Sequence, residues 1–315
     1  MALYVAGSLA FDRIMTFPGK FEDHILPEKL HILNVCFLID SFEQTRGGTA
    51  GNIGYNLALL GEKPILVSSV GWDFDAYAEV LTDLGLSLEG ICRTDEYITA
   101  GAYITTDLAS NQITGFYPAA MNLPSAYDFP NADPKEDIAL IGPTNGDDMK
   151  RLPVFFKEKG IRYIFDPGQQ IPVFSGQELL EALTGSTVLI ANDYEIEMIC
   201  QMTGKSRDDL RKFTDCLIVT LGEEGSIVYE RDRQTRIDIA KAERVADPTG
   251  CGDAYRAGLL KGMRIGLPMP VCAQLGAACA SFCVEHAKPQ GQTFSMADFV
   301  ARYEASFGAL PAGII

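Results

Sequence analysis

Short apolar runs alternate along this chain with longer segments in which apolar residues recur every three or four positions. The apolar runs predict buried strands in residues 1–7 and at Ile65–Val70, Ile138–Ile141, Tyr163–Phe165, Val188–Ala191 and Leu217–Thr220. The periodic segments predict helices at Phe74–Leu84, Met149–Lys159, Tyr194–Met202, Asp253–Ile265, Met269–Glu285 and Met296–Ala305. This order favours a parallel sheet with helices covering both of its faces.

Two regions do not follow the alternation. Residues 12–46 lack a clear helical period, and residues 97–117 are β-prone on both sides of Asp107–Ser110, which predicts a hairpin. We interpret the two regions as one small sheet built from separate segments. The rest of the chain, residues 1–11, 47–96 and 118–315, is then expected to form one large α/β domain.

Composition and charge narrow the range of partners. A chain of 315 residues can form one large domain or two smaller ones, and 47% hydrophobic residues can form a sizeable core. The net charge of −16 argues against nucleic-acid polymers and anionic membranes, although a nucleotide needs only a local anion site. The sequence leaves open whether the chain is a monomer or a homodimer.

The sequence also indicates where the protein is expected to work. No apolar run reaches the roughly 18 residues of a membrane span, and the first residues lack the basic region of a signal peptide. The eight cysteines include no Cys-x-x-Cys pair, and the three histidines have no zinc spacing. Scattered free cysteines favour a reducing compartment, so we expect a cytoplasmic protein.

The stretch Asp247–Tyr255 places two glycines and then an acid where a predicted helix begins. A helix start presents free N–H groups and partial positive charge, and glycines let an anion approach that backbone. Asp253 would repel such an anion unless its task is to take a proton from an alcohol that is being phosphorylated. The alternative is an acid that only stabilises the helix dipole.

A second stretch, Arg46–Gly61, opens with Gly47 and Gly48 and continues through Asn52 into an apolar helix. Together the two stretches resemble the signatures of the ribokinase (PfkB) family of carbohydrate and nucleoside kinases, a Gly-Gly turn followed by Asn and an Asp-x-Thr-Gly-x-Gly-Asp loop. Other landmarks extend the resemblance over nearly the whole chain. It implies a ribokinase-like three-layer α/β/α sandwich with a central, mostly parallel sheet and a small β-sheet lid over the substrate.

The resemblance also implies the chemistry of the site. ATP would donate its γ-phosphoryl group, Asp253 would act as the base, and the backbone N–H groups of Gly250, Cys251 and Gly252 would hold the developing negative charge. Substrate contacts are implied for four residues: Asp12, Gly47, Gly48 and Asn52. The two oxygens of the Asp12 carboxylate suit the diol of a ribose, although a turn aspartate is the simpler reading of that position alone.

Cofactor contacts are implied by three further motifs. Asn192-Asp193-Tyr194-Glu195 resembles the family's Asn-x-x-Glu motif, in which Glu195 acts on Mg²⁺ through water, although this spacing also forms a helix capping box. Thr220, Gly222 and Gly225 resemble the turn that meets ATP. Asp247 and Thr249 occupy the positions that hold K⁺ in many family members. Gly204-Lys205-Ser206 is no phosphate loop, because Ile199 stands where its first glycine would be.

The substrate class rests on the lid sequence. Residues 104–118, Asp166–Gln169 and Asp253–Arg256 look most like bacterial and archaeal nucleoside kinases, often named adenosine kinases. We therefore predict transfer to the 5′-hydroxyl of adenosine, inosine or guanosine. Candidates to line the base pocket are Phe116, Tyr117, Phe37 and Met121. The alternatives are a sugar kinase of the ribokinase or fructokinase type and a ligand-binding regulator that has lost catalysis, against which the intact Asp253 argues.

Overall fold

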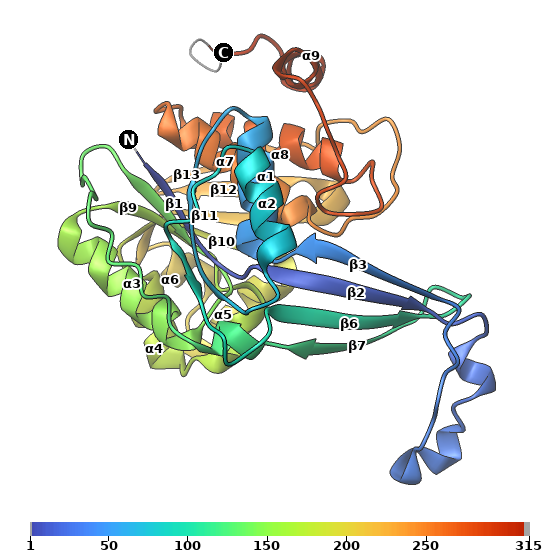
Figure 1. Ribbon diagram of the computed structural model, residues 1–315. Helices are drawn as coiled ribbons and strands as arrows, with labels where there is room; N and C mark the ends of the chain where they lie inside the picture. The colour runs from blue at the N-terminus through green and yellow to red at the C-terminus, as the bar shows by residue number, and fades with distance from the viewer. Residues whose placement is uncertain (1, 312–315) are drawn as a thin grey trace.

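The computed structural model describes residues 2–311 of the chain. Its central layer is a sheet with the strand order β13-β12-β11-β10-β9-β8-β1-β4-β5 (Figure 1). The strands are β1 Leu3–Ala6, β4 Ile65–Val70, β5 Ile91–Arg93, β8 Ile138–Ile141, β9 Arg162–Phe165, β10 Ser186–Asn192, β11 Thr214–Thr220, β12 Ser226–Glu230 and β13 Arg233–Ile237. They pair in parallel except at β12 and β13, which add an antiparallel edge.

Helices cover both faces of this sheet, so the predicted fold class is confirmed. Alternate residues of β1 enter different cores, with Leu3 and Val5 on one face and Tyr4 and Ala6 on the other. The first face is covered by α1 Thr49–Leu59, α2 Asp75–Asp83, α7 Cys251–Arg264 and α8 Met269–Cys283. The second is covered by α3 Gly146–Lys159, α4 Gly176–Leu183, α5 Asp193–Thr203 and α6 Arg207–Leu210. Helix α9, Met296–Phe307, packs on α8.

A second, smaller sheet projects from the body (Figure 1). Its strand order is β3-β2-β6-β7, from β2 Ala10–Thr16, β3 Ser41–Gly47, β6 Ala100–Thr106 and β7 Gln112–Tyr117. The β6–β7 pair is the expected hairpin around Asp107–Ser110, whereas β2 and β6 pair in parallel. The two irregular regions of the sequence therefore do meet in one sheet. The proposed boundaries between a lid and a large domain stay a prediction.

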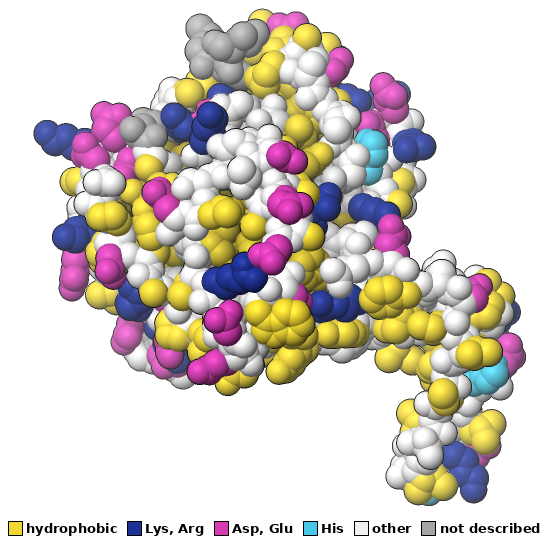
Figure 2. Space-filling view, in the orientation of Figure 1, with side chains coloured by type: hydrophobic (Ala, Val, Ile, Leu, Met, Phe, Trp, Pro, Cys, Tyr) yellow, Lys and Arg dark blue, Asp and Glu magenta, His cyan; other side chains and the backbone are white. Residues whose placement is uncertain are grey.

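Between β2 and β3 the chain forms an arm beyond the small sheet (Figure 1). Its short 3-10 helices, Phe21–Asp23 and Pro27–Ile32, lack the apolar period of an α-helix, so the sequence pattern did not predict a helix here. Phe17, Phe21 and Phe37 pack together at its base. Several leucines of the arm stay exposed, among them Leu30 and Leu38, and hydrophobic side chains are visible on the arm in Figure 2.

The remaining differences from the expected elements are small. Helix α7 begins at Cys251, two residues before the expected start, because Gly250 in the left-handed region ends the preceding turn. Helix α4 was not expected; it is short, and its start is defined by a capping box at Ser175. Within residues 2–311, every helix is too short or too polar to cross a membrane.

Candidate functional site

The chemistry-bearing residues gather at the carboxyl edge of the parallel strands. Asn192 ends β10 and pairs in register with Thr220, which ends β11. Asp166 follows β9 directly, and its N–H donates to the Ile141 carbonyl at the end of β8 at 2.9 Å. This edge is where open α/β sheets bind ligands, because loops there leave the sheet in different directions.

The first turn of α7 leaves backbone N–H groups free, as the predicted anion site requires. Gly250 has a φ of 81°, and a Cβ there would lie 2.7 Å from the Pro289 ring, so only glycine fits. The N–H groups of Gly250, Gly252 and Asp253 have no acceptor among the described residues. The N–H of Cys251 instead donates to the Pro248 carbonyl at 3.1 Å. The turn thus presents three free N–H donors at the positive end of a helix. The expected donors were Gly250, Cys251 and Gly252, but the free N–H of Asp253 replaces that of Cys251 in this set.

Asp253 has the environment of a base that works near neutral pH. It is half-buried, and its Oδ2 accepts a hydrogen bond from Asn52 Nδ2 at 2.8 Å. Burial raises the pKa of Asp253 to about 7, although the Asn52 hydrogen bond and the nearby Arg256 charge act in the opposite direction. A carboxyl group with such a pKa can exist in both states at the pH of a cell and can therefore accept and release a proton.

Asn52 is itself held by a hydrogen-bond chain. Gln290 Nε2 donates to Asn52 Oδ1 at 3.1 Å and to the Tyr77 hydroxyl at 2.8 Å. Tyr77 in turn donates to the Gly47 carbonyl at 2.9 Å. The chain fixes the Asn52 amide with its NH₂ group toward Asp253. Sequence reasoning missed Tyr77 and Gln290, since Tyr77 lies on the buried face of an amphipathic helix and Gln290 lies in a loop without a motif.

Gly47 and Gly48 are required by the protein's own packing. A Cβ on Gly47 would lie 2.5 Å from Asp12 Oδ2, and one on Gly48 would lie 2.5 Å from the Ser8 carbonyl oxygen. Gly48 also has a φ of 86°. The first glycine therefore leaves room for the Asp12 carboxylate beside the start of α1. The expected direct approach of a sugar to this backbone stays a prediction.

Asp12 and Phe116 share one face of the small sheet. Asp12 pairs with Ala102 across β2 and β6, and Ala102 pairs with Phe116 across β6 and β7, so the three side chains point to the same side. Asp12 is half-buried, burial raises its pKa, and no hydrogen-bond donor reaches its carboxylate within residues 2–311. Phe116 is 48% exposed. This one face of the small sheet could thus contact both a sugar hydroxyl, through Asp12, and a flat ring, through Phe116.

The other three candidates for a base pocket occupy different surroundings. Tyr117 alternates with Phe116 and points to the opposite face of β7. Phe37 belongs to the aromatic cluster of the arm, and Met121 is buried against Ala10 and Ala100. Ala10 and Ala100 alternate with Asp12 and Ala102 on one face of the small sheet, so the exposed Phe116 and the buried Met121 are both on the Asp12 face.

The predicted nucleotide residues line up along the edge of β10 and β11. Asn192 and Glu195 form a capping box, with Glu195 Oε2 accepting the Asn192 N–H at 2.8 Å. Thr220 leads into a turn in which Gly222 and Gly225 both have positive φ. A Cβ on Gly225 would lie 2.1 Å from the Ile237 carbonyl oxygen, whereas Gly222 has open space around it. Gly225 therefore shapes the turn, and Gly222 leaves room beside it.

The residues present fit hydrated or weakly held cations. Glu195 keeps its Oε1 without a protein donor in the described part of the chain, which suits a water shell of Mg²⁺. Asp247 accepts the Thr249 N–H at 2.7 Å through Oδ1, and its other oxygen accepts no donor in the described part of the chain, which suits the expected K⁺ contact. Across residues 2–311, no three His, Cys, Asp or Glu side chains gather as a metal centre of their own.

A buried ion pair stands directly behind these groups. Arg256 lies one turn after Asp253 on α7, and its guanidinium holds the Asp166 carboxylate with two nitrogens. Both residues belong to stretches that look like nucleoside kinases, yet the sequence assigned neither of them a role. Their pairing could not be read from the sequence because ninety positions separate them.

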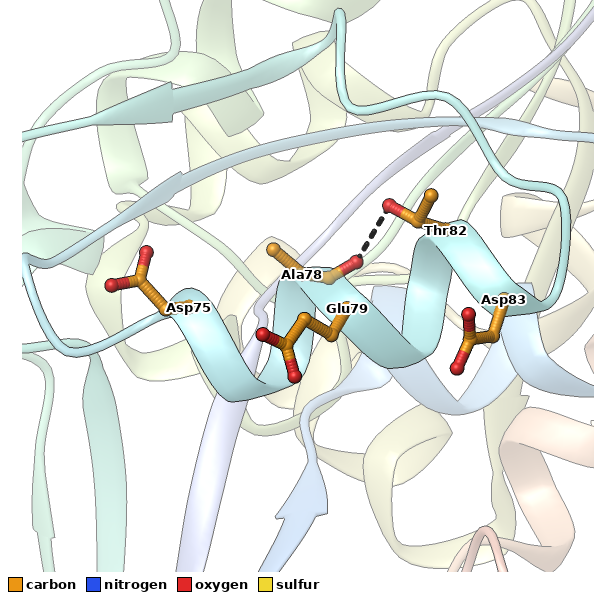
Figure 3. A pocket seen from close by; sticks show the side chains of 5 residues that line it. All are labelled: Asp75, Ala78, Glu79, Thr82 and Asp83. Atoms are coloured by element: carbon orange, nitrogen blue, oxygen red, sulfur yellow. Dashed lines mark hydrogen bonds between the residues drawn. The ribbon is translucent and has the colours of Figure 1, made fainter.

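A hollow on the outer face of α2 is separate from this site. The hollow is lined by Asp75, Ala78, Glu79, Thr82 and Asp83 (Figure 3). The Thr82 hydroxyl donates to the Ala78 carbonyl at 2.9 Å. Three carboxylates on an exposed helix face repel phosphate groups, so this hollow is unsuited to a nucleotide.

Comparison with known proteins agrees with this geometry. Residues 22–293 match the pfkB family carbohydrate kinases. A nucleoside kinase of Methanocaldococcus jannaschii is 34% identical over 261 residues, which cover 82% of this chain and 85% of that protein. A cytidine kinase of Thermococcus kodakarensis is 27% identical over 251 residues, which cover 73% of this chain and 84% of that protein.

Solved structures show the same architecture. The nucleoside kinase of Burkholderia thailandensis in complex with inosine has a TM-score of 0.87 and 36% identity, covering 99% of this chain and 100% of that chain. The same kinase in complex with ADP-inosine has a TM-score of 0.84 and 37% identity, covering 98% and 97%. The similarity therefore includes both sheets and the edge on which the candidate site lies.

Proposed function

Because the chain belongs to the pfkB family of carbohydrate kinases, and is thus a phosphotransferase that acts on a hydroxyl group, we propose that it phosphorylates the 5′-hydroxyl of a purine nucleoside with ATP. The observation that carries the proposal is the position of Asp253. Its carboxylate lies beside three free backbone N–H groups and is held by Asn52 at 2.8 Å.

The residues support a direct transfer. Asp253 accepts the proton of the substrate hydroxyl as that oxygen attacks the γ-phosphorus of ATP; the bond from this phosphorus to the β,γ-bridging oxygen breaks, and ADP leaves. The N–H groups of Gly250, Gly252 and Asp253 hold the negative charge that develops on the transferred group. Asp12 accepts hydrogen bonds from the ribose hydroxyls, and the Asn52 amide holds Asp253 in place. The nucleotide lies along the turn from Thr220 to Gly225.

Cations complete the proposed site. Mg²⁺, held through water near Glu195, would neutralise charge on the ATP phosphates. K⁺ would lie near Asp247 and Thr249. Glu195 itself is partly shielded, and burial raises its pKa while its hydrogen bond from the Asn192 N–H lowers it. The capping box therefore fixes where that carboxylate can act.

A purine is favoured over a pyrimidine or a free sugar. The solved relative with 36% identity was crystallised with inosine, and Phe116 offers a ring face on the Asp12 side of the small sheet. The cytidine kinase relative is less similar, at 27% identity. The family's carbohydrate kinases make a sugar kinase the second candidate.

A thermal-shift panel tests the substrate class. A ligand that binds only the folded protein raises its unfolding midpoint by mass action. With a non-hydrolysable ATP analogue and Mg²⁺ present, inosine, adenosine and guanosine are expected to raise the midpoint more than cytidine, ribose or fructose at equal concentration. A larger shift with ribose or fructose would identify a sugar kinase instead, and a larger shift with cytidine would reject the purine preference.

A further inference from the structure

Arg256 and Asp166 form a fork-shaped ion pair beneath the anion site. Arg256 donates from Nε and Nη2 to the two oxygens of Asp166, the latter at 2.9 Å. Both side chains are shielded from solvent, with 9% and 3% of their surfaces exposed. A bidentate contact between a guanidinium and a carboxylate fixes direction as well as distance. The side chain of Arg256 therefore has one allowed position relative to the end of β9.

The third arm of the guanidinium reaches the anion turn. Arg256 Nη1 donates to the Gly252 carbonyl at 3.0 Å. That carbonyl and the N–H of Asp253 belong to one planar trans peptide, so they point in opposite directions. Holding the carbonyl toward Arg256 therefore aims the Asp253 N–H away from it, into the anion site. A Cβ on Gly252 would lie 2.9 Å from Nη1, which keeps this position free of a side chain.

The pair also balances charge around the base. Arg256 is one cation that faces three acids, Asp166, Asp253 and Glu195. The groups that face Asp253 are Asn52 from α1, Arg256 from α7, Asp166 from the end of β9 and Asp12 from β2. Arg256 lowers the pKa of Asp253, whereas Asp166 and Asp12 raise it. Removal of the Arg256 charge should therefore raise the pKa of Asp253, whereas removal of the Asp166 charge should lower it.

We infer that Arg256 and Asp166 are a positioning pair that holds the Gly252–Asp253 peptide in the orientation needed to stabilise the transferred phosphoryl group. The inference rests on the proposed kinase function and extends it to two residues that do not touch the substrate. The bidentate contact of the pair orients the anion turn, and the charges of the pair affect the ionisation of Asp253.

Arg256→Lys separates geometry from charge. Lysine keeps the positive charge but cannot hold Asp166 with two nitrogens and Gly252 with a third. We expect kcat to fall by about 10²-fold, the scale of a small misplacement at a reacting centre, while the nucleoside KM changes little. The acidic limb of the kcat/KM profile should stay near that of the wild type.

Asp166→Asn and Arg256→Gln should move that acidic limb in opposite directions. Loss of the Asp166 charge lowers the pKa of Asp253 and moves the limb to lower pH. Loss of the Arg256 charge raises it and moves the limb to higher pH. If the pair had only a structural role, both variants would show a lower yield or a lower unfolding midpoint. The acidic limbs of their kcat/KM profiles would then not shift in opposite directions.

Arg264 on the same helix provides the matched control. It pairs with Glu62 at the other end of α7, where Lys261 Nζ also reaches Glu62 at 2.6 Å. Arg264→Lys breaks a comparable ion pair far from Asp253 and is expected to leave kcat within a factor of about 2.

Hydrogen exchange provides a readout that does not depend on turnover. The Ala254 N–H, which donates to the Gly250 carbonyl at 2.9 Å, should exchange faster in Arg256→Lys than in Arg264→Lys. Unchanged exchange in the anion turn together with wild-type kcat would overturn the inference. A wild-type protein that phosphorylates no nucleoside and no sugar would instead reject the proposed function, while the exchange comparison would still decide whether the pair orders the turn.

Discussion

Asp253 must be ionised to accept a proton, yet burial favours its neutral form. The opposing effects of burial and of the neighbouring groups give Asp253 a pKa of about 7. Asn52 and Arg256 both favour the ionised form, Asn52 by donating its amide to the carboxylate at 2.8 Å and Arg256 by its charge. The same amide is fixed by Gln290 at 3.1 Å. The ionisation of Asp253 therefore depends on neighbours from several parts of the chain.

The pH dependence of the free enzyme should report this pKa. Below about 7 Asp253 is protonated and cannot act as a base, so kcat/KM is expected to fall about tenfold for each pH unit well below that value. The measurement is kcat/KM for inosine between pH 5 and pH 9, with protein integrity checked at each pH. A profile that stays flat down to pH 5 would show that Asp253 does not titrate near neutrality.

Asp12 is expected to distinguish ribose from deoxyribose. Its carboxylate is half-buried and lacks a protein donor among the described residues, so a missing hydroxyl leaves an acceptor unpaired. This costs about 1–3 kcal/mol. The wild type should therefore prefer inosine to 2′-deoxyinosine in kcat/KM, and Asp12→Ala should reduce that preference. Equal rates for both nucleosides in the wild type would remove Asp12 from the recognition of the diol.

Sequence reasoning identified the site residues that lie within a recognisable local sequence pattern. Asp253, Asn52 and Gly250 were found because glycines and a helix start surround them. Tyr77 and Gln290 carry no such pattern, since their role arises from contacts across the fold. The free donors of the anion turn also differ from the expected set: the Cys251 N–H binds Pro248, a backbone detail that side-chain identity does not encode.

At the scale of elements, glycines hold α7 close to α8. A Cβ on Gly258 would lie 2.3 Å from the Leu275 carbonyl oxygen, and one on Gly276 would lie 2.7 Å from the Tyr255 carbonyl oxygen. The Tyr255 hydroxyl also lies 2.8 Å from Ser226 Oγ on β12. Helix α7 is therefore anchored along its length, which gives its first turn a fixed place at the sheet edge.

The junction of β3 and α1 should be sensitive to a single methyl group. In Gly47→Ala the added Cβ would come within 2.5 Å of Asp12 Oδ2, so the carboxylate must move. We expect a loss of roughly 1–3 kcal/mol in the free energy of unfolding. In an Asp12→Ala background the same change should cost much less, as measured by urea unfolding of the four proteins. Additive costs would show that the two residues do not compete for this space.

The small sheet is expected to act as a lid. Residues 12–46 and 97–117 carry Asp12 and Phe116 on one face, and closure over a bound nucleoside would exclude water from the transferred phosphoryl group. Hydrogen exchange in both segments should slow when inosine binds, and ATP alone should slow it much less. The hinges are expected near Gly47-Gly48 and near Pro118. Identical exchange with and without nucleoside would rule out a substrate-closed lid.

Elements were more predictable from the sequence than their contacts. Strands β4 and β8 have the bounds that their apolar runs predicted, because buried parallel strands are apolar throughout. The arm between β2 and β3 could not be predicted, since its short 3-10 helices have no period and its apolar residues stay exposed. Strand β13 was missed because its residues, Arg233–Ile237, are mostly polar at the sheet edge.

At the scale of the whole molecule, the fold brings the two signatures together. Arg46–Gly61 forms the end of β3 and all of α1, and Asp247–Tyr255 leads into α7. Both helices cover the same face of the large sheet. The net charge of −16 is spread over a surface where acidic and basic side chains are interspersed on the face shown in Figure 2. A local anion site at the start of α7 is therefore compatible with an acidic protein.

Identification of the product tests the central claim most directly. With ATP and Mg²⁺, the protein is expected to convert inosine or adenosine to its 5′-monophosphate, identified by ³¹P NMR and mass spectrometry. Asp253→Asn should lower kcat by about 10²–10⁴-fold with little change in nucleoside affinity. Phosphorylation of ribose or fructose but of no nucleoside would contradict the account, as would wild-type turnover by Asp253→Asn.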